Sequence, residues 1–233
     1  MSLRDFYDRP DVPISSGSDR ARRQLRMLAS AVAGRGARTI VDVGCGDGAA
    51  TALVAGLDPR HHVVGVDWSA RAVATARAHG FHLVGGGVDA LPIASGAADV
   101  VIMSEVIEHL VDTDAALDEA RRVLRPGGVL LLSTPNLAAW YNRVLLGVGV
   151  QPVFSEVSLR AIHGRPGAQV VGHLHMFTRR ALVSLLRANG FVDVAVRGAR
   201  YHDVPSPLRL VDRLMCGWPA AASILLASAV RAA

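Results

Sequence analysis

Three side chains near the middle of the chain have the chemical types and the spacing of a catalytic or cation-binding group. Glu105, Glu108 and His109 stand at positions i, i+3 and i+4, so a helical segment would place all three on one face. Two carboxylates and an imidazole can bind a divalent cation, and a histidine by itself can act as a general base. A metal-free role, in which the glutamates cap and line a pocket, fits the same spacing and is slightly favoured. Under either interpretation we expect Glu105 and His109 to belong to the active site.

The glycine-rich segment VDVGCGDGAA predicts a ligand-binding turn between a strand and a helix. Gly44, Gly46 and Gly48 permit positive φ angles and a close approach of a ligand to the main chain. The pattern also fits a dinucleotide-binding turn, with Asp67 at a suitable distance downstream. However, a carboxylate at Asp42 would repel the pyrophosphate of a dinucleotide and attract the ammonium and sulfonium groups of S-adenosylmethionine. Charge therefore favours S-adenosylmethionine as the bound cofactor.

Further cofactor-binding candidates stand at the ends of two other predicted strands. Asp67 is placed for the ribose, because a carboxylate can accept hydrogen bonds from both hydroxyls of a vicinal diol. Trp68 follows it and is expected to lie against the adenine. A helix N-cap for Asp67 and a half-buried surface position for Trp68 are the alternatives. Ser104, which ends the fourth predicted strand, is the remaining candidate at this edge of the sheet.

Apolar runs alternate with amphipathic segments between residues 39 and 135, which is the pattern of βαβ units around a parallel sheet. Asp112 or Asp114, and later Thr178, are predicted to cap the helices that follow them. The last two strands lack a complete crossover helix between them, so we expect them to pair antiparallel. The predicted strands span residues 39–44, 62–67, 82–86, 98–104, 128–134, 191–199 and 223–231.

Length and segment composition indicate one domain over residues 1–233. Residues 1–35 are expected to form a helical lid, in which Phe6 and Tyr7 either cover the cofactor or belong to a disordered terminus. Residues 136–177 interrupt the regular alternation and are predicted to be a substrate-binding insertion. The helix of the lid is predicted to turn four apolar side chains inward, namely those of Leu25, Leu28, Ala29 and Val32.

Four motifs in order, VDVGCGDG, VVGVD, ALPIASGAADVVIMSEVIEHL and ARRVLRPGGVLLLSTPN, resemble those of class I S-adenosylmethionine-dependent methyltransferases. The resemblance covers roughly residues 38–200 and extends in particular to the type 11 branch, with the ubiquinone-biosynthesis O-methyltransferases, and to the small-RNA 2'-O-methyltransferases. It implies a Rossmann-like α/β fold with helices on both faces of a mostly parallel, seven-stranded sheet. The implied strand order is 3-2-1-4-5-7-6, with the seventh strand antiparallel.

The resemblance also implies a set of metal ligands. Both kinds of relative carry E-x-x-E-H after the fourth strand and a histidine shortly before the last large helix. Carried over by position, the ligands would be Glu105, Glu108, His109 and His175, and His173 is the substitute because it lies on the same side of an extended segment. A magnesium or manganese ion held there would bind two adjacent substrate oxygens, which predicts a vicinal diol or catechol-like acceptor.

The loop after the third predicted strand departs from the family pattern at one position. Relatives often read GDAEALPF there, and their aspartate contacts the adenine amino group. In this chain the corresponding residue is Gly87. Asp89, two residues later, is the expected replacement, and the main chain near Val88 is the alternative.

Composition limits the partners and the compartment. All 25 basic residues are arginine, and they are dispersed along a chain of net charge +5, a usage typical of GC-rich coding. This disfavours a nucleic-acid partner and favours a small-molecule substrate. The first residues lack the apolar core of a signal peptide and no apolar run reaches about 18 residues, which predicts neither secretion nor membrane insertion. Cys45 and Cys216 suggest no disulfide framework, so a cytoplasmic location is expected. Nothing in the sequence indicates an oligomeric state.

Three classes of function remain compatible with these features. The favoured one is methyl transfer from S-adenosylmethionine to a small molecule, with an oxygen as the acceptor atom. The second is methylation of RNA at the 2'-oxygen, or metal-independent methylation of nitrogen or carbon. The third, a non-catalytic S-adenosylmethionine-binding protein, is disfavoured because Asp42, the glycines and Asp67 are all present.

Overall fold

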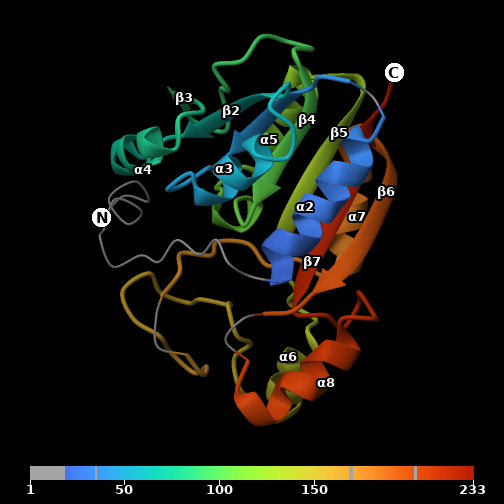
Figure 1. Ribbon diagram of the computed structural model, residues 1–233. Coiled ribbons are helices and arrows are strands. Elements are labelled where there is room, and N and C mark those ends of the chain that lie inside the picture. The colour runs from blue at the N-terminus through green and yellow to red at the C-terminus, as the bar shows by residue number, and fades with distance from the viewer. Residues whose placement is uncertain (1–18, 35, 168–169, 202–203) are drawn as a thin grey trace.

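One seven-stranded sheet organises the protein, as shown by a computed structural model that describes residues 19–34, 36–167, 170–201 and 204–233 (Figure 1). The strand order is β3-β2-β1-β4-β5-β7-β6, and β7 runs antiparallel to both of its neighbours. The other pairings are parallel, so the predicted Rossmann-like fold is confirmed. The strands are β1 (Thr39–Val43), β2 (His62–Asp67), β3 (His82–Gly85), β4 (Ala98–Ser104), β5 (Leu124–Pro135), β6 (Phe191–Ala199) and β7 (Ile224–Arg231).

Helices cover both faces of the sheet. One core packs β1, β2, β4, β5 and β7 against α5 (Thr113–Val123) and α7 (Arg179–Ala188), and a second core packs the opposite face against α2 (Asp19–Val32) and α3 (Ala49–Ala55). Because strands buried on both faces need apolar residues throughout, they read as continuous Val, Ile and Leu runs. The remaining helical elements are α4 (Ala70–Ala76), η1 (Arg77–His79), η2 (Ile107–His109), α6 (Trp140–Gly147), η3 (Ser206–Leu208) and α8 (Arg209–Met215).

Side-chain caps start the two helices for which they were predicted. Asp112 accepts a hydrogen bond from the Ala115 amide at 2.9 Å, and Thr178 accepts one from the Ala181 amide at 3.2 Å. Each cap satisfies an amide that has no partner within the first helical turn. The caps fix where α5 and α7 begin, and therefore how the segments before them approach the sheet.

The inward face of α2 agrees with the prediction at Leu25, Leu28 and Val32 and differs from it at Ala29. The structure buries Ala21, Gln24 and Leu28, whereas Ala29 is exposed. Leu25 and Val32 are only partly buried beside the second core. The helix is rotated because Gln24 turns inward to accept a hydrogen bond from the Ser104 hydroxyl at 2.9 Å, a polar contact that hydrophobic periodicity cannot predict. The prediction for Phe6 and Tyr7 concerns residues outside those described.

The described residues include no helix that is both long and apolar enough to cross a bilayer. Cys45 and Cys216 are both buried and unbonded to each other. The thiols therefore pack as small apolar groups, and burial raises the pKa of each.

Candidate active site

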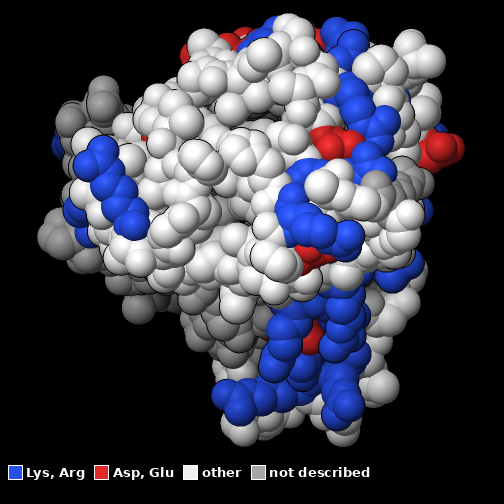
Figure 2. Space-filling view, turned by 45° about the horizontal axis from the view of Figure 1, so that its top comes forward, with Lys and Arg blue, Asp and Glu red and all other residues white. Residues whose placement is uncertain are grey.

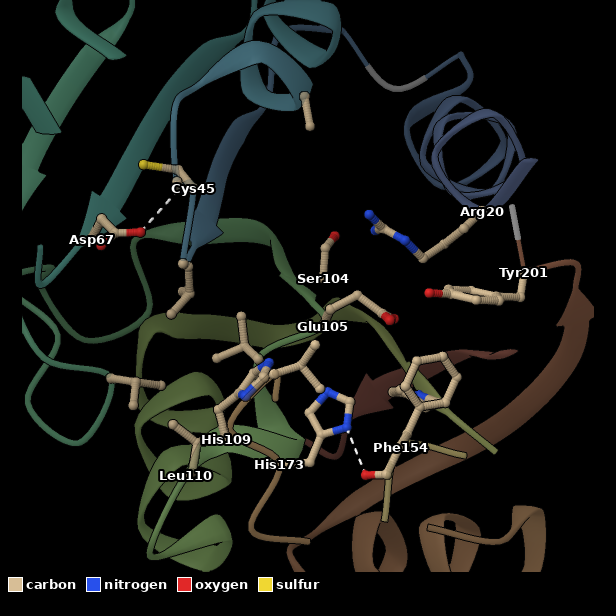
Figure 3. A pocket seen from close by; sticks show the side chains of 18 of the residues that line it. Arg20, Cys45, Asp67, Ser104, Glu105, His109, Leu110, Phe154, His173 and Tyr201 are labelled. Carbon is tan, nitrogen blue, oxygen red and sulfur yellow. Dashed lines mark hydrogen bonds between the residues drawn. The ribbon is translucent and has the colours of Figure 1, made fainter. Parts of the chain in front are cut away.

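A cavity of about 1510 Å³ lies at the carboxyl ends of β1, β2 and β4 (Figure 3). The strand order reverses between β1 and β4, and such reversal points are where open α/β sheets bind ligands. Its wall includes every residue predicted to bind the cofactor except Gly48, together with the predicted catalytic pair. These lining residues are Asp42, Gly44, Gly46, Asp67, Trp68, Val88, Asp89, Ser104, Glu105 and His109.

The glycine turn has the backbone that the sequence predicts. Gly44, Gly46 and Gly48 have φ angles of 72°, 55° and 79°. A Cβ on Gly44 would lie 2.5 Å from the Cγ2 atom of Val106, so even alanine would be obstructed there. Gly48 is the N-cap of α3 and faces Ala76 and Phe81 instead of the cavity. Gly48 therefore packs against α4 and the segment after it, while Gly44 and Gly46 border the cavity.

Asp42 is a buried carboxylate at the floor of the cavity. It is 5% exposed and accepts a hydrogen bond from the Thr51 hydroxyl at 2.6 Å. Burial raises its pKa to about 6, and the Thr51 hydrogen bond opposes this rise. A cationic ligand group would favour the charged form of such a carboxyl.

Asp67 and Trp68 follow β2 at the edge of the cavity. The Asp67 carboxylate accepts hydrogen bonds from the amides of Gly46 and Ser69, each at 2.9 Å. The helix that follows is capped by Ser69, which excludes the simple N-cap interpretation of Asp67. A carboxylate can accept more than two hydrogen bonds, so a ligand hydroxyl can share Asp67 with these amides. Trp68 is 41% exposed, which leaves its ring accessible to an adenine.

In the loop after β3, the side chain of Asp89 lies next to the main chain of Gly87. A Cβ on Gly87 would lie 2.5 Å from the Oδ1 atom of Asp89. The carboxylate of Asp89 thus occupies the space that a side chain on Gly87 would enter. This supports Asp89 as the replacement for the missing acid.

Glu105 occupies a strained position directly after β4. Its φ angle is 56°, in a region that residues other than glycine seldom adopt. Its amide donates to the Ser133 carbonyl at 3.0 Å, and its Oε1 accepts from the Ser133 hydroxyl at 2.8 Å. These contacts with β5 prevent Glu105 from starting a helix. The segment has only the short turn η2, so the expected helical face carrying Glu105, Glu108 and His109 is not formed.

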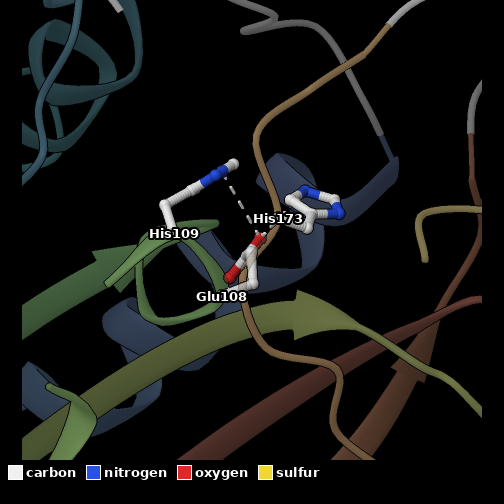
Figure 4. Close-up of side chains that lie close together, drawn as sticks. All are labelled: Glu108, His109 and His173. Carbon is white, nitrogen blue, oxygen red and sulfur yellow. Dashed lines mark ion pairs between the residues drawn. The ribbon is translucent and has the colours of Figure 1, made fainter. Parts of the chain in front are cut away.

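Glu108, His109 and His173 form a compact group, in which Glu108 and His173 are buried and His109 is partly buried (Figure 4). One ligand atom from each lies within 4.8 Å of the others, and both Nε2 atoms are 4.0 Å from Oε1 of Glu108. That oxygen is fully buried and accepts no hydrogen bond from any described residue, whereas Oε2 accepts from Thr134 at 3.0 Å. Burial, followed by the neighbouring Glu105, raises the pKa of Glu108. The group is thus a carboxylate oxygen without a partner between two imidazoles.

Main-chain carbonyls fix the orientation of both imidazoles. Nδ1 of His109 lies 3.2 Å from the Gly172 carbonyl, and Nδ1 of His173 lies 3.1 Å from the Phe154 carbonyl. A carbonyl can only accept, so each Nδ1 carries the proton and each Nε2 presents a lone pair toward Glu108. Burial lowers the pKa of His109 to about 3 and that of His173 to about 4, which keeps both rings neutral. This is the arrangement in which histidine binds metals.

His175 lies apart from this group. It is exposed, and its Nε2 is 3.4 Å from the Val111 carbonyl. The amides of Leu174 and His175 both donate to the Glu108 carbonyl, at 2.8 and 3.0 Å. These two hydrogen bonds bend the chain between His173 and His175. The two histidine side chains therefore do not lie on one side of the segment, as an extended chain would place them. Of these two histidines, His173 is the one whose side chain reaches Glu108.

Glu156 holds the segment that carries His173. Its carboxylate accepts hydrogen bonds from the amides of Val171, Gly172 and His173 at 2.7 to 3.1 Å, and pairs with Arg165 at 2.8 Å. The side chains of this ion pair are 2% and 4% exposed. The sequence did not predict these contacts of Glu156, because loop residues without a regular pattern separate it from Arg165 and from the amides of residues 171–173.

Other lining residues also escaped prediction. Arg20 of α2, Phe154, Tyr201 and Tyr141 face the same cavity from four separate segments. No motif connects them, and only the packing of α2 and the insertion against the sheet brings them together. The described part of the predicted lid contributes to the cavity through Arg20.

Comparison with known proteins identifies the family. The profile of the methyltransferase domain matches residues 18–196. The chain belongs to this methyltransferase family. Members use S-adenosylmethionine as the methyl donor, in agreement with the Asp42 and glycine pattern described above.

Two enzymes of quinone biosynthesis and one solved structure illustrate what the chain is similar to. A ubiquinone/menaquinone C-methyltransferase from Rubrivivax gelatinosus is 30% identical over 197 residues, covering 78% of this chain and 70% of that protein. A ubiquinone O-methyltransferase from Chelativorans sp. is 31% identical over 128 residues, covering 52% and 47%. Phosphoethanolamine N-methyltransferase 2 of Haemonchus contortus, in complex with S-adenosylmethionine, superposes with a TM-score of 0.68 at 17% identity, covering 100% and 60%.

The matched regions are parts of longer proteins in several cases. The chain spans 36% to 52% of the length of four mycobacterial and streptomycete relatives, three of which are named as probable S-adenosylmethionine-dependent methyltransferases. The relatives include enzymes that are named for methylation of carbon and enzymes that are named for methylation of oxygen. The family therefore fixes the donor and the fold, and the acceptor must be inferred from the site.

Proposed function

We propose that this protein transfers the methyl group of S-adenosylmethionine to an oxygen atom of a small-molecule acceptor. The observation that carries the proposal is one cavity whose wall includes the glycine turn together with His109 and His173, the two histidines that flank the buried Glu108. Methyl transfer is an in-line displacement, so the site must align an oxygen with the donor methyl and lower the proton affinity of that oxygen.

Each end of the cavity has groups suited to one substrate. At the donor end, Asp42 would attract the ammonium and sulfonium groups, Asp67 would accept from the ribose hydroxyls and Trp68 would lie against the adenine. Asp89, or the main chain at Val88, would contact the adenine amino group. Bound in this way, the donor supplies an activated methyl group. Ser104 and Glu105, at the end of β4, would border the donor methyl.

The acceptor end fits a divalent cation. The unpartnered Oε1 of Glu108 and the Nε2 atoms of the two histidines are three convergent ligand atoms, and Glu105 is a further carboxylate close enough to raise the pKa of Glu108. In this proposal His173 takes the place of His175. A bound magnesium or manganese ion would lower the pKa of a coordinated hydroxyl. Two adjacent oxygens bind such an ion better than one, which points to a vicinal diol or a catechol-like acceptor.

The alternative role of His109, as a lone general base, is less well supported. A base works best when its pKa lies near the working pH, whereas burial lowers the pKa of His109 to about 3. A neutral imidazole with a fixed Nε2 lone pair suits a ligand better than a proton acceptor. We therefore favour metal-assisted O-methylation over metal-independent transfer to nitrogen or carbon, and a small acceptor over RNA.

A methyl-transfer assay with labelled S-adenosylmethionine tests this proposal. The acceptors are catechol, a vicinal diol, an amine of similar size and a short RNA, each with and without a chelator. We expect transfer to the catechol or diol, loss of transfer in the chelator and recovery with magnesium or manganese. Transfer to the amine or RNA, or full transfer to oxygen in the chelator, would contradict the proposal. Calorimetry with S-adenosylmethionine in the chelator checks that donor binding survives.

A further inference from the structure

Helix α8 is turned the opposite way from an ordinary surface helix. Its inward side carries Asp212, which is 1% exposed and accepts hydrogen bonds from Trp140 Nε1 at 3.2 Å and from the Ser223 hydroxyl at 2.5 Å. Its outward side carries Leu210 and Leu214, each 67% exposed. Water-facing helices place leucine inward and acids outward. The polar contacts of Asp212 hold α8 in this inverted orientation.

Helix α6 enlarges the apolar surface beside α8. The Trp140 to Asp212 contact joins the two helices, which lie together at the lower end of the molecule in Figure 1. Val144 and Val148 are 61% and 71% exposed. Scattered exposed leucines need no explanation, but a gathering of large apolar side chains on one face marks an interaction surface. We call this surface the α6–α8 face; its exposed apolar residues are Val144, Val148, Leu208, Leu210, Leu214 and Trp218.

The charges of the α6–α8 face are positive. Segments 140–150 and 204–220 contain three arginines and a single acid, the buried Asp212. Arg209 and Arg213 lie one turn apart beside Leu210 and Leu214. Arg143 lies with its guanidinium 5.6 Å from the ring centre of Trp218. Figure 2, in which the top of the molecule is turned toward the viewer, shows that basic side chains also gather on another part of the surface.

We propose that the α6–α8 face docks on the surface of an anionic lipid bilayer. Leucines on the outward side of a helix, a tryptophan at the margin and arginines beside them are the features of segments that lie in a bilayer interface without crossing it. The arginines supply attraction to anionic headgroups, and the leucines supply apolar area that headgroups and upper acyl chains can cover. A protein partner or RNA would not require both features in this arrangement.

The α6–α8 face borders the cavity, so docking of this face on a bilayer would affect how an acceptor enters. Val144 and Leu208 are exposed on the face and also line the cavity. Docking would therefore turn one mouth of the cavity toward the bilayer, and an acceptor with an apolar chain would enter directly from it. This consequence rests on the proposed methyl transfer. The docking itself does not, because it can be measured without donor or turnover.

Vesicle flotation with the purified chain tests the docking. We expect the protein to float with vesicles of phosphatidylcholine and phosphatidylglycerol, and much less with phosphatidylcholine alone. The double variant Leu210→Ser/Leu214→Ser should lower the bound fraction about tenfold or more on anionic vesicles. Arg209→Gln/Arg213→Gln should remove the preference for anionic vesicles and leave weak binding to both kinds.

Matched control variants change the same residue types elsewhere. Leu53→Ser/Leu57→Ser removes two leucines that are 51% and 42% exposed near α3, and Arg179→Gln/Arg180→Gln removes two exposed arginines at the start of α7. Both should float like the unaltered protein, and circular dichroism should show that all variants are folded. The proposal is overturned by absence of vesicle binding, by equal binding of the Leu210/Leu214 variant, or by a dimer or an RNA complex that this variant abolishes while vesicle binding is absent.

Discussion

The Nε2 atom of His173 lies 4.0 Å from the Oε1 atom of Glu108, although the two residues belong to segments far apart in the chain. The buried Oε1 atom has no hydrogen-bond partner among the described residues, and a cation between the two atoms would satisfy it. We predict that His173→Ala lowers manganese affinity, measured by calorimetry or electron paramagnetic resonance, by about 10- to 100-fold or more.

The neighbouring histidine provides the matched control for this change. His175→Ala should leave manganese affinity unchanged, because that ring is exposed and turned away. Combining Glu108→Gln with His173→Ala should cost about as much affinity as the more severe single change, since both residues serve one site. Equal losses for His173→Ala and His175→Ala would show that the buried group is not the metal site.

Asp42 predicts that donor binding depends on pH. Because burial raises its pKa from 3.8 to about 6, the ligand-free fold favours the neutral form. The neutral carboxyl therefore stabilises the ligand-free fold fully below about pH 4. As the pH rises to about 6, the free energy of unfolding falls by about 3 kcal/mol. A cationic donor favours the carboxylate, so affinity should rise from pH 5 to 7 and then level off.

Calorimetry between pH 5 and 8 measures this dependence, and Asp42→Asn is the informative variant. The amide cannot ionise but still accepts from Thr51, so the variant should bind the donor weakly, with a flat profile in this range. Its ligand-free form should unfold at a higher temperature than the unaltered protein at pH 7. The same pH dependence in both proteins would assign the titration to another group.

Asp89 and Gly87 permit an exchange experiment. Asp89→Ala should weaken S-adenosylmethionine binding about tenfold, the loss of roughly one hydrogen bond. Adding Gly87→Asp to that variant should restore much of the affinity, because the new carboxylate enters the space vacated by the old one. Gly87→Asp alone should weaken binding, since its side chain meets Asp89 at close range. Failure of the double variant to recover would favour main-chain recognition near Val88.

The ion pair of Glu156 and Arg165 predicts a large loss of stability. Glu156→Gln leaves a buried guanidinium without its carboxylate and weakens the hold on the Gly172 and His173 amides, which should lower the free energy of unfolding by about 3–5 kcal/mol. Urea denaturation measures this loss. Asp58→Asn, which breaks the exposed pair with Arg60, is the control and should have little effect. Similar denaturation midpoints for the two variants would contradict the structural role.

The sequence predicted the sheet well because each strand and each helix start is encoded by residues that are close together in the chain. Each strand is a continuous apolar run, and residues such as Asp112 and Thr178 act within one helical turn. The position of the candidate cofactor residues at the strand ends, around one cavity, could be predicted for the same reason. The choice between His173 and His175 could not, because it depends on a bend set by two hydrogen bonds to Glu108. Arg20 and Tyr201 reach the cavity only through packing between distant segments, which leaves no trace in local spacing.

The position of β7 between β5 and β6 has a consequence for biosynthesis. In the described structure β6 pairs only with β7, and β7 follows it in the chain. Until the ribosome has added the residues from Ile224 onward, β6 lacks β7, the strand with which it pairs. The nascent chain must therefore keep β6 unpaired until β7 has been synthesised. Interruption of translation just before β7 should leave a product that chaperones bind and proteases degrade.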